Sequence, residues 1–131
     1  MDVYTASTAI QAPPDTVFGY LAEPANQPNW AVNFVRSTRP ADDGWWVMDT
    51  PVGEITYRID VEPTHRVADW VMNGPTGEMV MPARVVPLAD GSLMTFTIIR
   101  GPGQTDEAWE GGKRGMDEEL GVFRDILEGR R

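Results

Sequence analysis

Six consecutive strand-like segments separated by short turns fill the middle of this chain, and this pattern constrains the fold most. The segments span residues 34–38, 45–50, 54–62, 67–73, 78–87 and 93–100. The breaks between them are rich in glycine, proline and aspartate, which are typical of turns. Short turns can join antiparallel strands, whereas parallel strands need long crossover connections. The pattern therefore predicts an antiparallel sheet built from hairpins.

Residues 54–62 give the clearest strand, because apolar and polar side chains alternate along it. Such alternation predicts one apolar and one solvated face. If residues 67–73 and 78–87 pair across the turn at 73–77, their apolar residues lie on the same face. The predicted inner face then collects aromatic residues and methionines, namely Tyr57, Trp70, Met72, Met79, Met81, Met94 and Phe96.

Helices are expected on both sides of this strand-rich region. Residues 3–11 predict a first strand, and two short helices follow, the second one closing at Trp30. From about Thr105 to Glu128, large apolar residues recur every three, four or seven positions, which predicts a long amphipathic helix. The fold class is therefore α+β, with six or seven antiparallel strands curved around a C-terminal helix.

The apolar inner face has two interpretations: a closed core, or a cavity that binds an apolar molecule. Methionine suits surfaces that accept varied apolar ligands, and ligand pockets are mostly apolar. Gly112 shares a stripe of the long helix with Trp109 and Met116, so it leaves either a gap or a close approach to the sheet. We favour a cavity that binds a small apolar molecule, lined by Trp30, Tyr57, Trp70, Met72, Met81, Phe96 and Met116. The sequence does not decide whether Trp45 or Trp46 faces this cavity.

Composition excludes several classes of protein. A length of 131 residues predicts a single domain over residues 1–131. The net charge of −9 disfavours nucleic-acid binding. No apolar run approaches the roughly 20 residues of a membrane span, and the first residues lack a signal-peptide pattern, so a cytoplasmic location is expected. The sequence leaves the oligomeric state open.

No catalytic residue, metal or cofactor is expected. The chain has no cysteine, and its one histidine, His65, falls in a predicted turn. Phosphate-binding loops and nucleophile elbows are also missing. Asp69 and Arg84 are expected to form an ion pair across neighbouring strands on the outer face. The exception is Asp49, whose strand has an undetermined register; an inward Asp49 near Tyr57 would favour an enzyme, because burial raises the pKa of a carboxyl group.

The order of elements resembles that of the SRPBCC superfamily, which includes START-like lipid carriers, pollen-allergen proteins and polyketide cyclase/dehydratase families. Local sequences that carry the resemblance are residues 10–21, Trp30, Gly91-Ser92, Phe96-Thr97, Arg100-Gly101-Pro102-Gly103, Glu118-Glu119-Leu120 and Leu127-Glu128. The resemblance implies a helix-grip fold with a hydrophobic pocket between the sheet and the long helix. Three functions are compatible with this fold. We favour binding of a lipid-like or aromatic, polyketide-like ligand over a cyclase/dehydratase-like enzyme or an interaction domain of the chaperone-ATPase-activator type.

Overall fold

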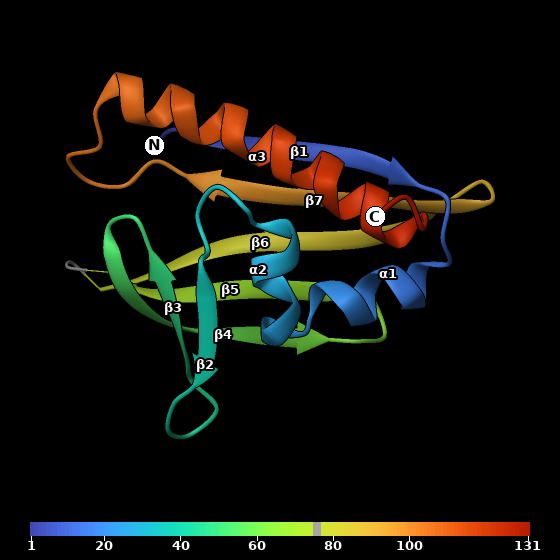
Figure 1. The fold of residues 1–131 in the computed structure, drawn as a ribbon, viewed down its shortest axis with the longest axis horizontal. Helices are drawn as coiled ribbons and strands as arrows, with labels where there is room; N and C mark the ends of the chain where they lie inside the picture. The colour runs from blue at the N-terminus through green and yellow to red at the C-terminus, as the bar shows by residue number, and fades with distance from the viewer. Residues whose placement is uncertain (75–76) are drawn as a thin grey trace.

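Seven strands form one antiparallel sheet in the computed structural model, which describes residues 1–74 and 77–131 (Figure 1). The strands are β1 (Val3–Ile10), β2 (Ser37–Pro40), β3 (Trp46–Thr50), β4 (Gly53–Glu62), β5 (Val67–Gly74), β6 (Gly77–Leu88) and β7 (Gly91–Ile99). Their order across the sheet is β1-β7-β6-β5-β4-β3-β2. Strands β2 to β7 therefore pair with their neighbours in sequence, as the short turns predict. Pro75 and Thr76, in the expected turn at 73–77, lie outside the described residues.

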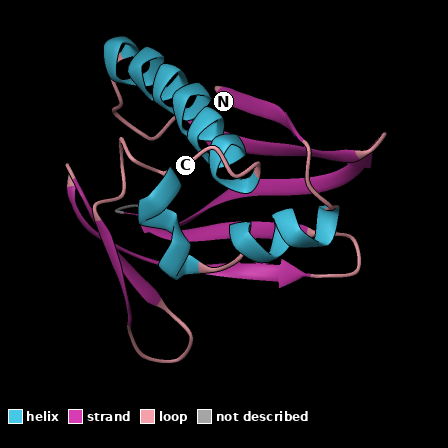
Figure 2. Cartoon of the chain, turned by 45° about the vertical axis from the view of Figure 1, so that its right-hand side comes forward, coloured by secondary structure: helices cyan, strands magenta, loops and turns pink. Residues whose placement is uncertain are grey.

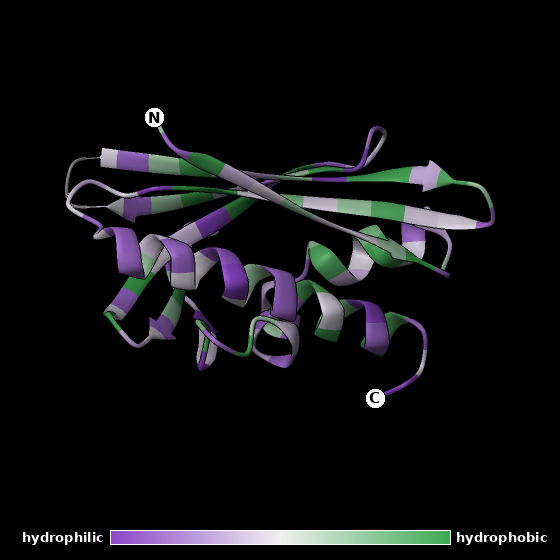
Figure 3. Ribbon diagram, turned by 90° about the horizontal axis from the view of Figure 1, so that it is seen from above, coloured by the Kyte–Doolittle hydropathy of each residue, from purple (hydrophilic) through white to green (hydrophobic). Residues whose placement is uncertain are grey.

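The helices cover one face of this sheet. They are α1 (Pro14–Leu21), the short 3-10 helix η1 (Pro24–Asn26), α2 (Gln27–Trp30) and the long α3 (Asp106–Leu127). Figure 3 shows them as a single layer beneath the sheet, and Figure 2 shows α2 between α3 and the lower strands. The Thr105 hydroxyl begins α3 by accepting a hydrogen bond from the Ala108 amide at 3.1 Å. This arrangement confirms the predicted α+β helix-grip fold.

The register of the strands confirms the shared inner face. Trp70 lies opposite Met81, and Met72 lies opposite Met79. Met72 also lies opposite Tyr57 on the other side of β5. Because side chains alternate along a strand, these residues all point toward the helices.

The first predicted strand of the central series begins later than its sequence suggests. The pattern predicts extended backbone from residue 34, but β2 starts at Ser37. The amides of Phe34 and Val35 both donate to the carbonyl oxygen of Ala31, at 3.1 and 2.8 Å, so the chain is still turning there. Apolar residues in this turn reach the core without a strand, since Val35 is buried.

One end of the inner face is fully covered, and we call it the closed end. Helix α1 packs there against β6 and β7. Ala68, Ala83, Val85 and Met94 are completely buried beneath it. Helix α3 lies along β1, where the Tyr4 hydroxyl donates to an Asp117 carboxylate oxygen at 2.7 Å. Among the described helices, none is long and apolar enough to cross a membrane.

Candidate ligand-binding site

The seven predicted lining residues come together between the sheet and its helices. Five of them are buried in the main hydrophobic cluster: Trp30, Tyr57, Trp70, Phe96 and Met116. Met72 and Met81 are half-buried and pack against that cluster. The sequence pattern thus gathers these side chains correctly, and their role in lining a cavity stays a prediction.

Aromatic rings form the centre of this cluster. The Trp30 ring lies 6.1 Å from that of Phe96 and 5.4 Å from that of Phe123, both in edge-on geometry. The Phe96 ring in turn lies 4.9 Å from that of Trp70. Aromatic pairs at these distances add stability beyond their buried area. The Trp70 indole also donates to the buried side-chain oxygen of Gln27 at 3.3 Å, which fixes α2 over the sheet.

Opposite the closed end, the inner face is only partly covered, and we call this region the open end. It extends from β7, where Ile98 lies near Gly112 of α3, across the sheet to β3; in Figure 1, α3 lies along β1 and β7, and β3 and β4 lie toward the other edge of the sheet. Its apolar side chains come from five strands and are half-buried: Trp46, Ile55, Met72, Met79, Met81 and Ile98. The open end is therefore an apolar surface that the protein does not fully cover.

Glycines on α3 help to leave this region uncovered. Gly112 is exposed, and a Cβ atom built there would meet only the Ile98 Cδ1 atom, at 4.0 Å. An added methyl group would therefore reach ordinary van der Waals contact with Ile98, and the gap expected on the stripe of Trp109 and Met116 stays a prediction. A close approach of helix and sheet backbones does not explain this glycine, because a methyl group fits.

The register of β3 decides which of the two adjacent tryptophans faces the site. Trp46 lies opposite Tyr57, so it belongs to the inner face. Trp45 lies on the outer face, where the Arg58 guanidinium stacks 4.7 Å from its ring centre. Asp49 points outward as well, because its neighbours Met48 and Thr50 are buried. An inward Asp49 near Tyr57, the feature that would have favoured an enzyme, is not found.

Tyr57 is the inward polar group that the sequence predicts, and its side chain is 0 % exposed. Its hydroxyl has no hydrogen-bond partner in the described parts of the chain. Burial raises the pKa of Tyr57, and the charge of Glu23 raises it further, so the phenol stays neutral. The Trp30 indole N–H is likewise buried and unpaired among the described residues.

Sequence reasoning missed Glu119, a buried carboxyl group on α3. It is 6 % exposed, and one of its oxygens accepts a hydrogen bond from the Asn33 amide at 2.9 Å. Burial raises the pKa of Glu119 to about 7, although hydrogen bonds from the Asn33 and Phe34 amides oppose the shift. Glu119 is three residues from Met116 and four from Phe123, so it lies at the edge of the apolar stripe of the helix. This spacing was the sequence signal that could have indicated its burial.

A family profile described as polyketide cyclase/dehydrase and lipid transport matches residues 1–128. The chain belongs to this family. This family match supports the SRPBCC superfamily, which the order of elements resembles. No curated protein is similar enough in sequence to count as a match.

Solved structures share the fold of this polyketide cyclase/dehydrase family member at low sequence identity. The protein XoxI from Bacillus cereus is 16% identical with a TM-score of 0.78, and the match covers 97% of this chain and 96% of that one. The Aha1 dimer structure from Colwellia psychrerythraea is 16% identical with a TM-score of 0.73, and the match covers 98% of this chain and 97% of that one. The Zhui aromatase/cyclase from Streptomyces sp. R1128 is 18% identical with a TM-score of 0.69, and the match covers 98% of this chain and 92% of that one. These likenesses show the fold alone.

Other polar residues of this family member lie away from the inner face. His65 is in a turn, and its exposed ring lies 3.1 Å from a Glu62 oxygen. Arg84 and Asp69 form the expected outer ion pair at 2.8 Å. They meet diagonally, because Asp69 lies opposite Pro82 in the ladder. Within residues 1–74 and 77–131, no three metal-ligating side chains gather.

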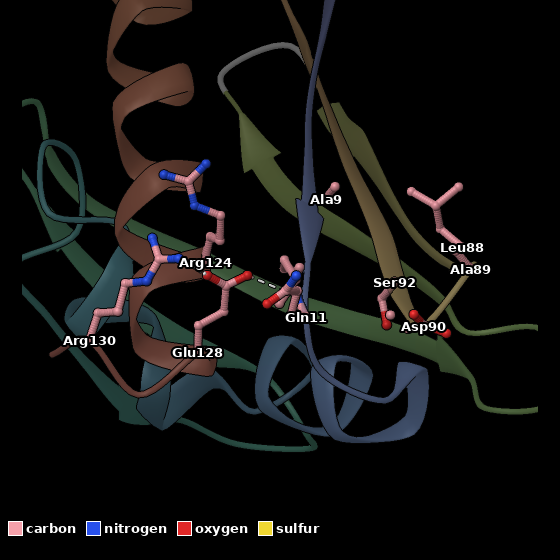
Figure 4. Close-up of a pocket in the computed structure, with 11 residues that line it drawn as sticks. Ala9, Gln11, Leu88, Ala89, Asp90, Ser92, Arg124, Glu128 and Arg130 are labelled. Carbon is pink, nitrogen blue, oxygen red and sulfur yellow. Dashed lines mark hydrogen bonds and ion pairs between the residues drawn. The ribbon is translucent and has the colours of Figure 1, made fainter.

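Two surface hollows lie apart from the seven predicted lining residues, and the second of them borders the open end at Met79. The larger one, of about 490 Å³, lies between the end of β1, the β6–β7 hairpin and the last turns of α3 (Figure 4). Glu128 bridges its walls by accepting a hydrogen bond from the Gln11 amide at 2.8 Å. The other, of about 370 Å³, lies beside Met79, Ile99 and Arg100. None of the seven predicted lining residues borders either hollow.

Proposed function

We propose that this protein binds a small apolar molecule, lipid-like or aromatic and polyketide-like, between the inner face of its sheet and α3. The observation that carries the proposal is the open end, where apolar side chains from five strands remain half-buried on the inner face of the sheet. Apolar surface that a protein leaves accessible on one face is typical of a region that binds a ligand or partner. Met72, Met79 and Met81 can adapt to ligands of different shape. The family description, which joins cyclase/dehydrase activity with lipid transport, supports the same ligand class.

The expected affinity follows from the area such a ligand covers. Burial of roughly 400 Å² of apolar surface contributes about 10 kcal/mol. Association costs at least about 4 kcal/mol in lost motion. The difference corresponds to a dissociation constant of tens of micromolar, which a fluorescent probe can measure.

The adjacent tryptophans Trp45 and Trp46 provide a matched test. We expect Trp46→Gln to weaken binding of the neutral probe N-phenylnaphthylamine about tenfold, because loss of roughly 55 Å² of apolar contact costs about 1.4 kcal/mol. Trp45→Gln removes the same side chain from the outer face and should leave binding unchanged. Equal effects of the two substitutions, or no binding by the native protein, would refute the proposal. Native mass spectrometry of freshly purified protein would reveal a retained ligand.

A cyclase/dehydratase-like enzyme is the second candidate, and Glu119 is the observation that favours it. A buried carboxyl group with a pKa of about 7 suits a general acid or base near neutral pH. Against this role, one of its oxygens is already engaged by the backbone of Asn33. Turnover of polyketide-like aromatic compounds by the native protein, lost in Glu119→Gln, would establish the enzyme; binding without turnover supports the carrier.

A further inference from the structure

The larger surface hollow, of about 490 Å³, has two unlike walls (Figure 4). One wall is apolar and includes Ala9 of β1 and Leu88 at the end of β6. The other is charged and comes from Arg124, Glu128 and Arg130, in and just after the last turns of α3. A hollow of this volume can hold a small organic molecule. It lies at the opposite ends of β6 and β7 from the open end, so it is separate from the site proposed above.

The two arginines of this hollow differ in how the protein engages them. Arg130 Nη2 lies 3.0 Å from Glu128 Oε1, and the other Glu128 oxygen accepts from the Gln11 amide at 2.8 Å. Arg124 Nε lies 3.7 Å from Asp125 Oδ1, which is too long for a hydrogen bond. This Nε has no hydrogen-bond partner in the described parts of the chain. Glu128 is therefore fully engaged, whereas Arg124 lacks an acceptor at its Nε.

Asp125 does not supply that acceptor, because two other arginines also face it. Arg130 Nη1 lies 3.7 Å from its Oδ1 atom, and Arg131 Nε lies 3.6 Å from its Oδ2 atom. Three guanidinium groups thus share one carboxylate, and none of these three contacts is a hydrogen bond. The helix dipole favours basic residues near the C-terminal end of α3, which explains why they gather there. It does not explain why they are short of acceptors, so this cluster can take another anion.

The walls of the hollow narrow the class of anion. The Arg124 side chain is 42 % exposed, so a molecule in the hollow can reach its guanidinium group. Guanidinium groups bind carboxylates and phosphates through paired hydrogen bonds. Asp90 and Glu128 also border the hollow and would repel a doubly charged phosphate more than a singly charged carboxylate. Leu88 is 46 % exposed on the apolar wall, where an aryl or short alkyl group would cover it.

We propose that this hollow binds a small organic monocarboxylate, whose carboxylate pairs with the Arg124 guanidinium and whose apolar group packs against Leu88. The protein then has two binding sites of different chemistry. The inner face takes a neutral apolar molecule, and the hollow at the end of β1 takes a small anion.

Benzoate and benzamide provide the test, because they have nearly the same shape and differ in charge. Titration followed by amide NMR gives the dissociation constant of each, with sodium chloride holding the ionic strength constant. We expect benzoate to shift the amide signals of Ala9, Ser92 and Arg124, which line the hollow. It should bind the native protein about fivefold more tightly than benzamide, as one partly exposed ion pair implies.

Substitutions at the two walls should have different effects. Arg124→Gln removes the cation, so benzoate should bind about fivefold more weakly and benzamide as before. Leu88→Ala removes apolar contact that both probes share, so both should bind about threefold more weakly. Arg114→Gln is the matched control, because it changes the net charge equally on an exposed position of α3 that does not border the hollow. It should leave the affinity for both probes unchanged.

Three outcomes would overturn the proposal. Benzoate and benzamide could bind the native protein equally, or benzoate could shift only amides that lie away from the hollow. Equal weakening by Arg124→Gln and Arg114→Gln would show that net charge, and not this site, controls binding. N-phenylnaphthylamine keeps the two sites apart, since Arg124→Gln should bind it as the native protein does. Displacement of this probe by benzoate would place the carboxylate on the inner face and refute a separate site.

Discussion

The two ends of the inner face are built from the same strands but differ in what covers them. At the closed end, α1 packs over β6 and β7, and Ala83, Val85 and Met94 are fully buried. At the open end, Met81 and Ile98 continue the same strands but remain half-exposed. The α3 segment above them carries small residues, which place little side-chain volume over the sheet. The sheet therefore supplies one continuous apolar surface, and the helices decide which part of it is accessible.

The largest expected effect tests whether the two ends are packed differently. Trp70 is 0 % exposed and lies next to the closed end, so Trp70→Ala should lower the free energy of unfolding by about 3 to 5 kcal/mol. Met72, two residues further along β5, is half-exposed, and Met72→Ala should cost less than half as much. Urea unfolding measures both changes. Equal losses would mean that the open end is packed as tightly as the closed end.

A smaller effect concerns Glu119, which joins α3 to the segment after α2. Its pKa is raised by folding to about 7, so its contribution to stability is fully present at acidic pH and is lost as the pH rises from about 4.5 to 7. The shift corresponds to about 3 kcal/mol of unfolding free energy. Glu119→Gln should flatten this pH dependence. An exposed carboxyl group of the same helix that does not act on Glu119 provides the control, since Glu107→Gln should keep the native slope. If the unfolding free energy of Glu119→Gln depends on pH as steeply as that of the native protein, Glu119 is not the source of this pH dependence.

The smallest effect compares two glycines of α3. Alanine favours a helix over glycine by about 1 kcal/mol, and a methyl group added at Gly112 or at Gly121 would meet no side chain closer than 4.0 Å. Both Gly112→Ala and Gly121→Ala should therefore raise the thermal midpoint slightly. Only Gly112→Ala places its methyl group beside Ile98 at the open end, so it alone should weaken probe binding. Weaker binding in Gly121→Ala would show that helix stiffness, and not access, controls the site.

Sequence pattern predicts most of the fold because the relevant signals are local. Alternation and turn residues locate β3 to β7 within two residues, and the apolar period locates α3 within one. The signal fails at residues 34–36, where Ala31 accepts two backbone hydrogen bonds and keeps the chain turning. Apolar character alone cannot distinguish such a turn from a strand.

The candidate site was predictable in part. Parity along the strands gathers Tyr57, Trp70 and Phe96 on one face without knowledge of the fold. The choice between Trp45 and Trp46 depended on the turn between β3 and β4, which sets the register. Glu119 was missed because its hydrogen-bond partner Asn33 lies 86 residues away in sequence. Contacts of that range leave no local pattern.

The pairing of β1 with β7 has a consequence for the order of folding. Thr5 and Thr97 are neighbours in this pairing but are 92 residues apart, whereas β2 to β7 pair in series with their neighbours in sequence. Closing a loop of that length costs entropy before the contact returns any stability. We expect the meander of six strands to assemble first and the N-terminal strand to dock last, with α3 sealing it. During synthesis on the ribosome, the first strand made would thus wait, unpaired, for the last. Pulse-labelled hydrogen exchange during refolding would show late protection of the β1 amides, and early protection there would rule out this order.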